Sequence, residues 1–508
     1  MGFHVFRQLW PKRDRYEFVL LLRPSARNRK RFAPYLQASA RAPGAASPAG
    51  SLRIVWGDAT QLGDVAEAVR GADWVLNAMG VVSPQADYCP DRARAVNIGA
   101  VQNVVRAIEA EPGGAEHIRL IHTATVAETG DRLGSIHWGR MGDPLKPGVF
   151  DIYAVTKVVG ERAVIESNIR HWASLRLTYI LPTDFRGYVD LLDPIMFHLP
   201  LATFMETITD RDAGLGMANC LDIPEESDFW RRAYNMCGGP AMRFTAYDYM
   251  SANFRLIGLS GIEACAERRW FVLRNGHLNY FHDSHVLNSY LHFWRDSLES
   301  FWQSIWDDAP AAVKALAFAC RVPAVRRTVE RVVRGTMRRM AEHHKNGTAY
   351  WYRNGNHRRI SAYYRDNAAY EAIPDWGVEM PQLEPEPESA FLDHGYDESK
   401  AVLGPDDLRE AARFRGGECL TSEWDGDLYA AQPWRCAFGH EFTARPYTVL
   451  KAGHWCPECL PPPWSYDEEA RRNPFFAQVW YPNHDASEAN VYGPDCIEDI
   501  AGAQRTWG

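Results

Sequence analysis

Tyr153-Ala154-Val155-Thr156-Lys157 is the stretch that says most about the fold and the chemistry of this chain. A Tyr and a Lys four residues apart lie on one face of a helix, one turn apart. An ammonium group beside a phenol favours the phenolate, which can carry a proton to or from a hydroxyl or carbonyl group. Such pairs also occur by chance on surface helices, so the neighbouring sequence has to decide between a reactive pair and a surface pair.

Apolar segments that end in small or polar residues precede this helix. Residues 119–125 are expected to form a strand with Thr123 and Thr125 on one face, and residues 52–58 and 72–80 read as further strands. Strands and helical segments alternate roughly every 20 to 30 residues, which predicts a doubly wound parallel sheet. Ligands bind such sheets at the carboxyl ends of the strands, where these polar residues fall.

This ordered set resembles the short-chain dehydrogenase/reductase superfamily, in its extended, epimerase/dehydratase-like branch. The matching pieces are Gly57-Asp58, Asn77-Ala78-Met79-Gly80, Asn97, Thr123 and Thr125, Tyr153 and Lys157. Residues 175–182 resemble the strand and loop that close over the nicotinamide, and residues 234–240 resemble the strand that opens the substrate region. The resemblance covers about residues 1–300 and implies a Rossmann-like NAD(P)-binding fold.

The resemblance also implies roles for individual residues. Tyr153 would be the general acid/base, Lys157 would hold the ribose hydroxyls and lower the pKa of Tyr153, and Thr123 or Thr125 would orient the substrate oxygen. The dinucleotide is expected to contact Gly2, Arg23, Ser25, Asp58, Ala78, Met79, Gly80, Asn97, Lys157 and Leu181.

The start of the chain departs from the family pattern. The family opens with a strand and a Gly-x-x-Gly-x-x-Gly loop that cradles the pyrophosphate at a helix N-terminus. Here Gly2 matches the last glycine of that loop, and the first strand and two glycines are absent. Either the start codon is placed too late or the dinucleotide site is weakened. The presence of Tyr153, Lys157 and the two threonines favours the misplaced start.

The residues after the next strand bear on the choice of cofactor. An acid at this position binds the ribose 2′-hydroxyl of NAD, whereas an Arg accommodates the 2′-phosphate of NADP. The strand at residues 17–22 is followed by Arg23, Ser25 and Arg27. These side chains indicate NADP, with NAD or a solvated basic loop as the alternatives.

Composition fits an enzyme of two or three domains. The chain has 508 residues and a net charge of −8, so no global basic field attracts nucleic acid. No apolar run is long enough to span a bilayer, and no secretory signal is recognised, so no membrane contact is expected. The ten cysteines read as reduced thiols, which indicates a cytoplasmic protein.

The organisation along the chain follows from these segments. Residues 1–250 are expected to form the NAD(P)-binding domain, and residues 251–375 an aromatic-rich helical substrate or cap region. Residues 376–410 read as a linker, because Pro and Glu dominate residues 381–387. A zinc-ribbon domain at residues 411–465 and a tail at residues 466–508 complete the chain.

The ribbon is predicted from a second motif. Cys436 and His440 are separated by three residues, fifteen more lead to Cys456, and Cys459 completes a Cys-x2-Cys pair. Two such pairs supply four tetrahedral ligands, and a metal crosslink would supply folding energy to so small a module. The motif resembles treble-clef-like zinc ribbons, so the zinc is expected to be structural. His454 is expected to be redundant, and the linker is expected to decouple the module, so that chelation leaves the reductase domain folded.

Two functions stay open at this point. One is an NAD(P)-dependent oxidoreductase or epimerase that acts on a hydroxyl or carbonyl of a small-molecule substrate. The alternative is a non-catalytic dinucleotide-binding sensor or interaction protein with the ribbon as its binding arm. The ribbon could contact protein or nucleic acid, and a homodimer is among the expected assemblies. The missing glycine loop favours the sensor, whereas Tyr153, Lys157 and the threonines favour the enzyme.

Overall fold

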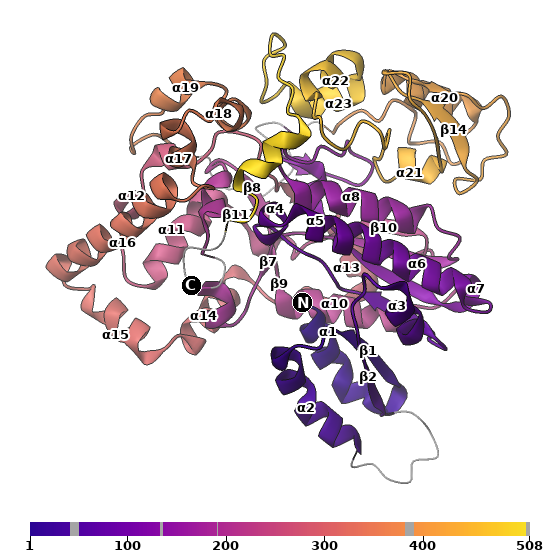
Figure 1. The fold of residues 1–508 in the computed structure, drawn as a ribbon, viewed down its shortest axis with the longest axis horizontal. Helices are drawn as coiled ribbons and strands as arrows, with labels where there is room; N and C mark the ends of the chain where they lie inside the picture. The colour runs from indigo at the N-terminus through magenta and orange to yellow at the C-terminus, as the bar shows by residue number, and fades with distance from the viewer. Residues whose placement is uncertain (41–49, 133–135, 190–191, 381–390, 504–508) are drawn as a thin grey trace.

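A computed structural model describes residues 1–40, 50–132, 136–189, 192–380 and 391–503 (Figure 1). Six parallel strands organise the first half of the chain. One pair consists of β1 (Phe18–Leu22) and β2 (Leu52–Trp56). A four-stranded sheet has the order β10 (Arg232–Met236), β6 (His171–Leu177), β4 (Arg119–Thr125) and β3 (Trp74–Asn77). This arrangement confirms the expected α/β fold with a parallel sheet.

The expected single sheet is divided into two. β1 and β3 each keep one edge without a strand partner among the described residues. Leu20 and Leu22 at the β1 edge pack against the same apolar cluster as Leu76 and Ala78 at the β3 edge. The first helix, α1 (Gly2–Leu9), starts at the second residue, so the printed sequence holds no strand ahead of it.

Helices cover both faces of the four-stranded sheet. One face carries α1, α10 (Asp210–Asn219) and α13 (Ser284–Leu291). The other carries α3 (Leu62–Val69), α6 (Val101–Ala110) and α8 (Ile152–Ile165). Successive strand side chains point to opposite faces, so Leu120 and Ile121 of β4 belong to different apolar clusters. The doubly wound architecture places α8 directly on β4 and β6.

Further short elements connect these parts. They are α2 (Ala26–Ala40), α4 (Gln85–Tyr88), α5 (Pro90–Ala93), the π-helix η2 (Arg94–Ala100), α7 (Gly114–His117), β5 (Trp138–Gly139), β7 (Ile180–Leu181), α9 (Phe185–Val189), β8 (Phe204–Glu206), β9 (Ile208–Thr209), β11 (Arg243–Thr245) and β12 (Tyr280–Phe281).

Helices dominate the middle of the chain. They are α11 (Ala246–Leu256), α12 (Ile262–Cys265), α14 (Leu298–Asp308), α15 (Ala311–Ala319), α16 (Pro323–His343), α17 (Thr348–Arg353), α18 (His357–Tyr364) and α19 (Asn367–Glu371). Phe254, Trp270 and Met337 are among the residues of their shared apolar core. Across the described ranges, we find no helix with both the length and the apolarity needed to cross a membrane.

The C-terminal part lies along α8 in Figure 1, coloured orange to yellow. Its elements are α20 (Pro405–Phe414), β13 (Glu418–Cys419), β14 (Gln432–Arg435), β15 (Glu441–Ala444), α21 (Pro446–Leu450), α22 (Tyr466–Arg472), α23 (Pro474–Trp480) and η9 (Pro494–Ile500). β14 lies between β13 and β15 in a small antiparallel sheet around the fully buried Trp434. We call residues 405–459 the ribbon module.

The ribbon module is not decoupled from the sheet domain, which corrects the expectation. The Pro/acid segment at 381–390 lies outside the described residues. Directly after it, the buried His394 binds Asp143 of the sheet domain at 3.0 Å, and Arg140 donates to the backbone oxygen of Leu392 at 2.9 Å. α20 already begins at Pro405, inside the expected linker. These polar contacts fix the connection onto the sheet domain.

The C-terminal tail is likewise part of the core. Trp464, Tyr466 and Ile497 share an apolar cluster with Phe150 and Ile152, which lie at the start of α8. This packing places the tail beside the helix that carries Tyr153.

Candidate active site and metal centre

The first turn of α8 places Tyr153 near the end of β4. The Asp151 side chain accepts a hydrogen bond of 2.8 Å from the Ala154 N–H, which caps the helix. Tyr153 is partly buried against the apolar cluster at the start of α8, and Thr125 is close enough to influence the pKa of its phenol. The helix that carries Tyr153 thus packs on β4, the strand that ends at Thr125.

The protonation of Tyr153 differs from the sequence expectation. Burial raises the pKa of Tyr153, Thr125 offsets only part of that effect, and the Asp151 and Glu128 carboxylates add to the rise. The phenol is therefore protonated at neutral pH. Burial and nearby negative charges both disfavour a phenolate.

Lys157 is fully buried one turn along α8. Its ammonium group donates a hydrogen bond to the backbone oxygen of Thr123. Burial lowers the pKa of Lys157 to about 8, against the attraction of the Glu128 and Glu161 carboxylates. The structure thus turns the Lys157 ammonium towards the β4 backbone and two acids.

The two candidate threonines have different surroundings. Thr123 donates from its hydroxyl to the backbone oxygen of Asn77 at 3.1 Å, which ties β4 to β3. The Thr125 hydroxyl accepts from the Ala127 N–H at 3.2 Å, donates to the Leu177 backbone oxygen of β6 at 3.4 Å, and lies near Tyr153. Both threonines therefore tie β4 to a neighbouring strand, and Thr125 is the one close to the phenol.

The candidate adenosine end of the cofactor site lies at the carboxyl ends of β1 and β2. Arg23 and Ser25 are exposed after β1, and the Ser25 hydroxyl accepts from the Asn28 N–H at 3.2 Å. Hydrogen bonds from Thr60 hold the pKa of Asp58 below its usual value, and Arg23 and Arg92 add to this effect. Arg23 and Asp58 therefore lie within electrostatic reach of one another.

Other expected cofactor residues have structural contacts. Gly2, at the start of α1, lies beside Ala78, whose Cβ is 3.4 Å from the position of an added Cβ. Asn97 is buried and bridges Val81, at 2.8 and 2.9 Å, and Thr156 of α8, at 3.0 Å. The Met79 N–H donates to the Asn77 side chain at 3.3 Å. Gly80 lies beside Asn97, and Leu181 is fully buried in the core.

These residues fit NAD(P) only in part. Exposed polar side chains that follow β1 and β2 are suited to bind the ribose of the adenosine. Thr125 and Tyr153 are suited to contact the nicotinamide end of the cofactor. Of the family's glycine loop, the described residues match only Gly2 at the start of α1.

Sequence reasoning missed a buried ionic network beneath the site. Glu161 of α8 accepts from Arg176 of β6 at 2.6 Å and from the Ser174 hydroxyl at 2.8 Å. The Glu128 carboxyl lies 3.5 Å from Arg176 and accepts from the Thr125 N–H at 3.2 Å. Burial and the nearby Glu161 raise the pKa of Glu128 well above its usual range. In the sequence, the only hint of this network was Glu161, a charged residue one helical turn after Lys157.

His454 lies outside the four-ligand cluster, as expected of a redundant ligand, and joins this network instead. Its Nε2 lies 2.9 Å from Glu161, and both side chains are almost completely buried. The residue comes from the ribbon module and meets the sheet domain at α8. Spacing along the chain gave no sign of this contact, since the two residues are 293 positions apart.

The four expected metal ligands converge. The side-chain ligand atoms of Cys436, His440, Cys456 and Cys459 all lie within 4.8 Å of one another. His440 Nδ1 is 3.4 Å from the sulfurs of Cys436 and Cys459 and 3.6 Å from that of Cys456. Ligands about 2.0–2.3 Å from a tetrahedral zinc are themselves about 3.5–3.8 Å apart, so the cluster has zinc-site dimensions.

Local structure explains this convergence. Cys436 and His440 face one another across the turn between β14 and β15, where the Cys436 N–H donates to the His440 backbone oxygen at 3.0 Å. Cys456 and Cys459 occupy a tight turn after α21.

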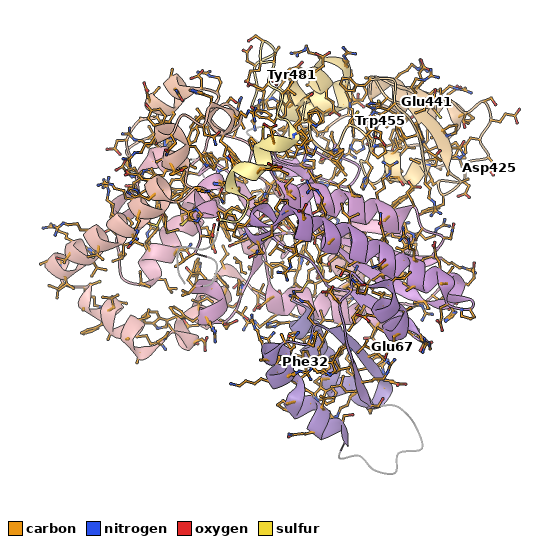
Figure 2. All side chains as sticks on the ribbon, in the orientation of Figure 1. Phe32, Glu67, Asp425, Glu441, Trp455 and Tyr481 are labelled. Carbon is orange, nitrogen blue, oxygen red and sulfur yellow. The ribbon has the colours of Figure 1, made fainter. Side chains whose placement is uncertain are left out.

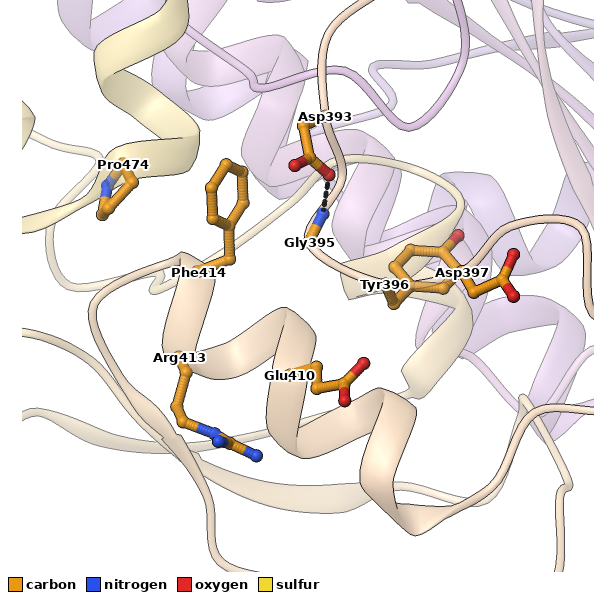
Figure 3. Close-up of a pocket in the computed structure, with 8 residues that line it drawn as sticks. All are labelled: Asp393, Gly395, Tyr396, Asp397, Glu410, Arg413, Phe414 and Pro474. Atoms are coloured by element: carbon orange, nitrogen blue, oxygen red, sulfur yellow. Dashed lines mark hydrogen bonds between the residues drawn. The ribbon is translucent and has the colours of Figure 1, made fainter.

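Two cavities lie near the ribbon module. Figure 3 shows one, which opens between residues 393–397, α20 and Pro474; Asp393 turns inward to accept from the Gly395 N–H at 2.7 Å. The other lies between α8 and the metal ligands, with Val158, Arg162 and Glu469 among its lining residues. Neither cavity is lined by Tyr153.

Comparison with protein-family models and with curated proteins gave no match. The fold is similar to solved NAD-dependent enzymes. One is the UDP-glucuronic acid 4-epimerase from Bacillus cereus with UDP-glucuronic acid and NAD, at 16% identity over 62% of this chain and 96% of that one, with a TM-score of 0.44. Another is the dTDP-glucose 4,6-dehydratase DesIV from Streptomyces venezuelae with NAD bound, at 20% identity over 63% and 92%, with a TM-score of 0.42.

A short-chain dehydrogenase/reductase superfamily protein from Agrobacterium tumefaciens with bound NAD is also similar. It has 15% identity over 60% of this chain and 99% of that one, with a TM-score of 0.40. These likenesses are loose, so no activity or substrate follows from them.

Proposed function

We propose that this chain is an NAD(P)-dependent oxidoreductase or epimerase that acts on a hydroxyl or carbonyl group of a small molecule. The observation that carries the proposal is the packing of α8, which carries Tyr153 and Lys157, on β4: the Lys157 ammonium donates to the Thr123 backbone oxygen, and Thr125 lies near the phenol. Tyr153 donates a proton to a carbonyl oxygen, or takes one from a hydroxyl, while Thr125 orients that oxygen. A nicotinamide cofactor supplies the hydride chemistry of such reactions when bound.

Lys157 has a supporting part in this proposal. Its buried ammonium lies one turn from Tyr153 and holds the backbone of β4 at Thr123. A positive charge here attracts electron-rich groups at the strand ends, and the family resemblance assigns Lys157 to the ribose hydroxyls of the cofactor.

Substitution of the phenol tests the proposal. Tyr153→Phe should abolish turnover of hydroxyl or carbonyl substrates while cofactor binding stays nearly intact, because only the transferable proton is lost. Lys157→Ala should damage both turnover and cofactor binding.

Thr125→Val should lower turnover at least about 100-fold, whereas Thr123→Val should mainly lower stability. Turnover is followed by the absorbance of reduced cofactor with a panel of alcohols, ketones and nucleotide sugars. Full turnover by Tyr153→Phe would refute the proton-transfer role.

We also propose that NADP is preferred over NAD, because Arg23 and Ser25 stand where an acid would bind the ribose. Fluorescence titration with both reduced cofactors measures the preference. Arg23→Ala should weaken NADPH binding more than NADH binding. A clear NADH preference of the unsubstituted protein would contradict the role of Arg23.

A non-catalytic dinucleotide sensor remains the second candidate. It is favoured by the partial burial of Tyr153, which limits the access of a substrate to the phenol. The sensor would bind the cofactor without turnover of any substrate in the panel, and Tyr153→Phe would leave its affinity unchanged.

We further propose that Cys436, His440, Cys456 and Cys459 bind one structural zinc ion. All four positions of a tetrahedral site are filled by protein side chains, so no position is left for substrate. Mass spectrometry of the freshly purified, reduced protein should find one zinc per chain. Cys459→Ser should lower the zinc content, whereas Cys419→Ser, in the same module but outside the cluster, should not. Zinc-free reduced protein would contradict the assignment.

A further inference from the structure

The ribbon module forms hydrogen bonds with one face of α8 at two successive turns. Arg162 donates to the backbone oxygen of Trp455 at 2.7 Å. One turn later, Glu166 accepts from the Arg445 N–H at 3.1 Å and from the Thr448 hydroxyl. Trp455 and Glu441 of the module are labelled in Figure 2, which shows the module against the sheet domain. The contact is therefore with the helix that carries Tyr153 and Lys157, and not with a remote surface.

The centre of this contact is ionic and buried. Glu161 is held by Arg176 from the sheet and by His454 from the module, with all three side chains at most 2% exposed. Arg176 also donates to the backbone oxygen of Ala452 at 2.7 Å. A buried charge that loses one partner is left uncompensated, and that state is strongly unfavourable. The module thus completes the solvation of a charge that belongs to α8.

The metal cluster lies next to this ionic contact in the chain. His454 is two residues before the ligand Cys456. The preceding Gly453 has a φ of +74°, and an added Cβ would lie 2.0 Å from the Asp143 backbone oxygen. His454 is thus held on one side by Gly453, whose backbone is in close contact with the sheet domain. On the other side it is followed by Cys456, which the proposed zinc ion would hold in place. Loss of the metal releases one of these two anchors.

We propose that metal loading of the Cys436, His440, Cys456 and Cys459 cluster sets the local stability of α8 through the contact of His454 with Glu161. His454 and Glu161 are positioning residues, since Glu161 lies one turn from Lys157 and two turns from Tyr153. The consequence for catalysis rests on the proposed function, but the coupling itself does not.

Hydrogen exchange of the full-length protein tests the coupling without any substrate. Backbone amides of residues 154–165 should exchange about tenfold faster after zinc is removed with a chelator than in the zinc-loaded protein. Amides of β1 and β2 serve as the internal reference, because no hydrogen bond or ion pair among the described residues joins these strands to the module, and they should not change. If the module amides at 446–450 lose protection while those of α8 keep it, the proposal is wrong.

Variants separate the ionic contact from the metal itself. His454→Ala should retain zinc by mass spectrometry and yet show the fast exchange of α8, whereas His454→Gln, which can still donate to Glu161, should recover part of the protection. The exposed His285→Ala is the matched control and should behave as the unsubstituted protein. A His454→Ala variant that holds zinc and exchanges normally would overturn the proposal. Retained turnover by Tyr153→Phe would overturn the proposed function alone.

Discussion

Tyr153 and Lys157 keep the helical spacing expected from the sequence, but their polar atoms meet different partners. The phenol faces Thr125, and burial raises its pKa. The ammonium faces the Thr123 backbone oxygen and two acids. Residue type and spacing therefore identified Tyr153 and Lys157 as candidates. Desolvation decided the protonation of the phenol, and the hydrogen bond to the β4 backbone decided where the Lys157 ammonium points.

A partly buried histidine allows a test of pH dependence at the same scale. The His198 ring packs against Trp351 and Tyr363, and its Nε2 donates to the Asn346 backbone oxygen at 2.9 Å. Burial lowers the pKa of His198 to about 3. The unfolded chain takes up this proton near pH 6.5, so the free energy of unfolding should fall as the pH is lowered through that value towards 3.

The slope from this one proton is at most about 1.4 kcal/mol per pH unit, and above pH 6.5 the stability is fully retained. Urea unfolding at a series of pH values measures it. His198→Gln keeps an N–H donor without a titrating ring and should show a shallower slope than the parent. The same change at the exposed His285 is the control, and parallel slopes in all three proteins would refute the assignment.

At the scale of elements, α8 is the meeting point of the structure. It packs on β4, β6 and η2, carries Tyr153 and Lys157, and binds the ribbon module. Its sequence reads as an apolar helix, which is why the helix was predictable. Its partners on the module were not, because the contacts join residues nearly 300 positions apart.

Two glycine-to-alanine substitutions, one in α8 and one in α16, test how tightly α8 is packed. An added Cβ at Gly160 would lie 2.4 Å from the Asn97 backbone oxygen of η2, whereas at Gly335 in α16 nothing lies within 4 Å. Gly160→Ala should destabilise the protein by about 1–3 kcal/mol through overpacking. Gly335→Ala should stabilise it by about 0.5–1 kcal/mol, because Ala favours the helix. Thermal and urea unfolding compare the two, and equal effects would contradict the close contact.

At the scale of the whole molecule, segments that read as appendages are built into the core. Residues after 464 cover apolar side chains at the start of α8, and Asp499 pairs with the buried Arg359 at 2.7 Å. The chain therefore has a C-terminal part that stabilises the site region and does not act as a separate arm.

Substitutions at two residues of the tail measure its contribution to the free energy of unfolding. Ile497 is 5% exposed, whereas Val491 is 61% exposed. Ile497→Ala should lower the free energy of unfolding by about 2–5 kcal/mol, since it leaves a cavity in a shared core. Val491→Ala should change it by less than about 0.5 kcal/mol. A tail that folds independently would instead give small effects at both positions on the main unfolding transition.

The sequence alone determined the parallel α/β class and the convergence of four Cys and His side chains, and it identified Tyr153 and two strand-end threonines as candidates for the site. These features depend on short spacings: periodicity 2 in strands, one helical turn, and a Cys-x2-Cys turn. The tertiary structure decided which threonine meets the phenol, where Lys157 points, and that His454 belongs to the network of α8. These outcomes depend on burial and on contacts between distant segments, and neither is encoded in local spacing.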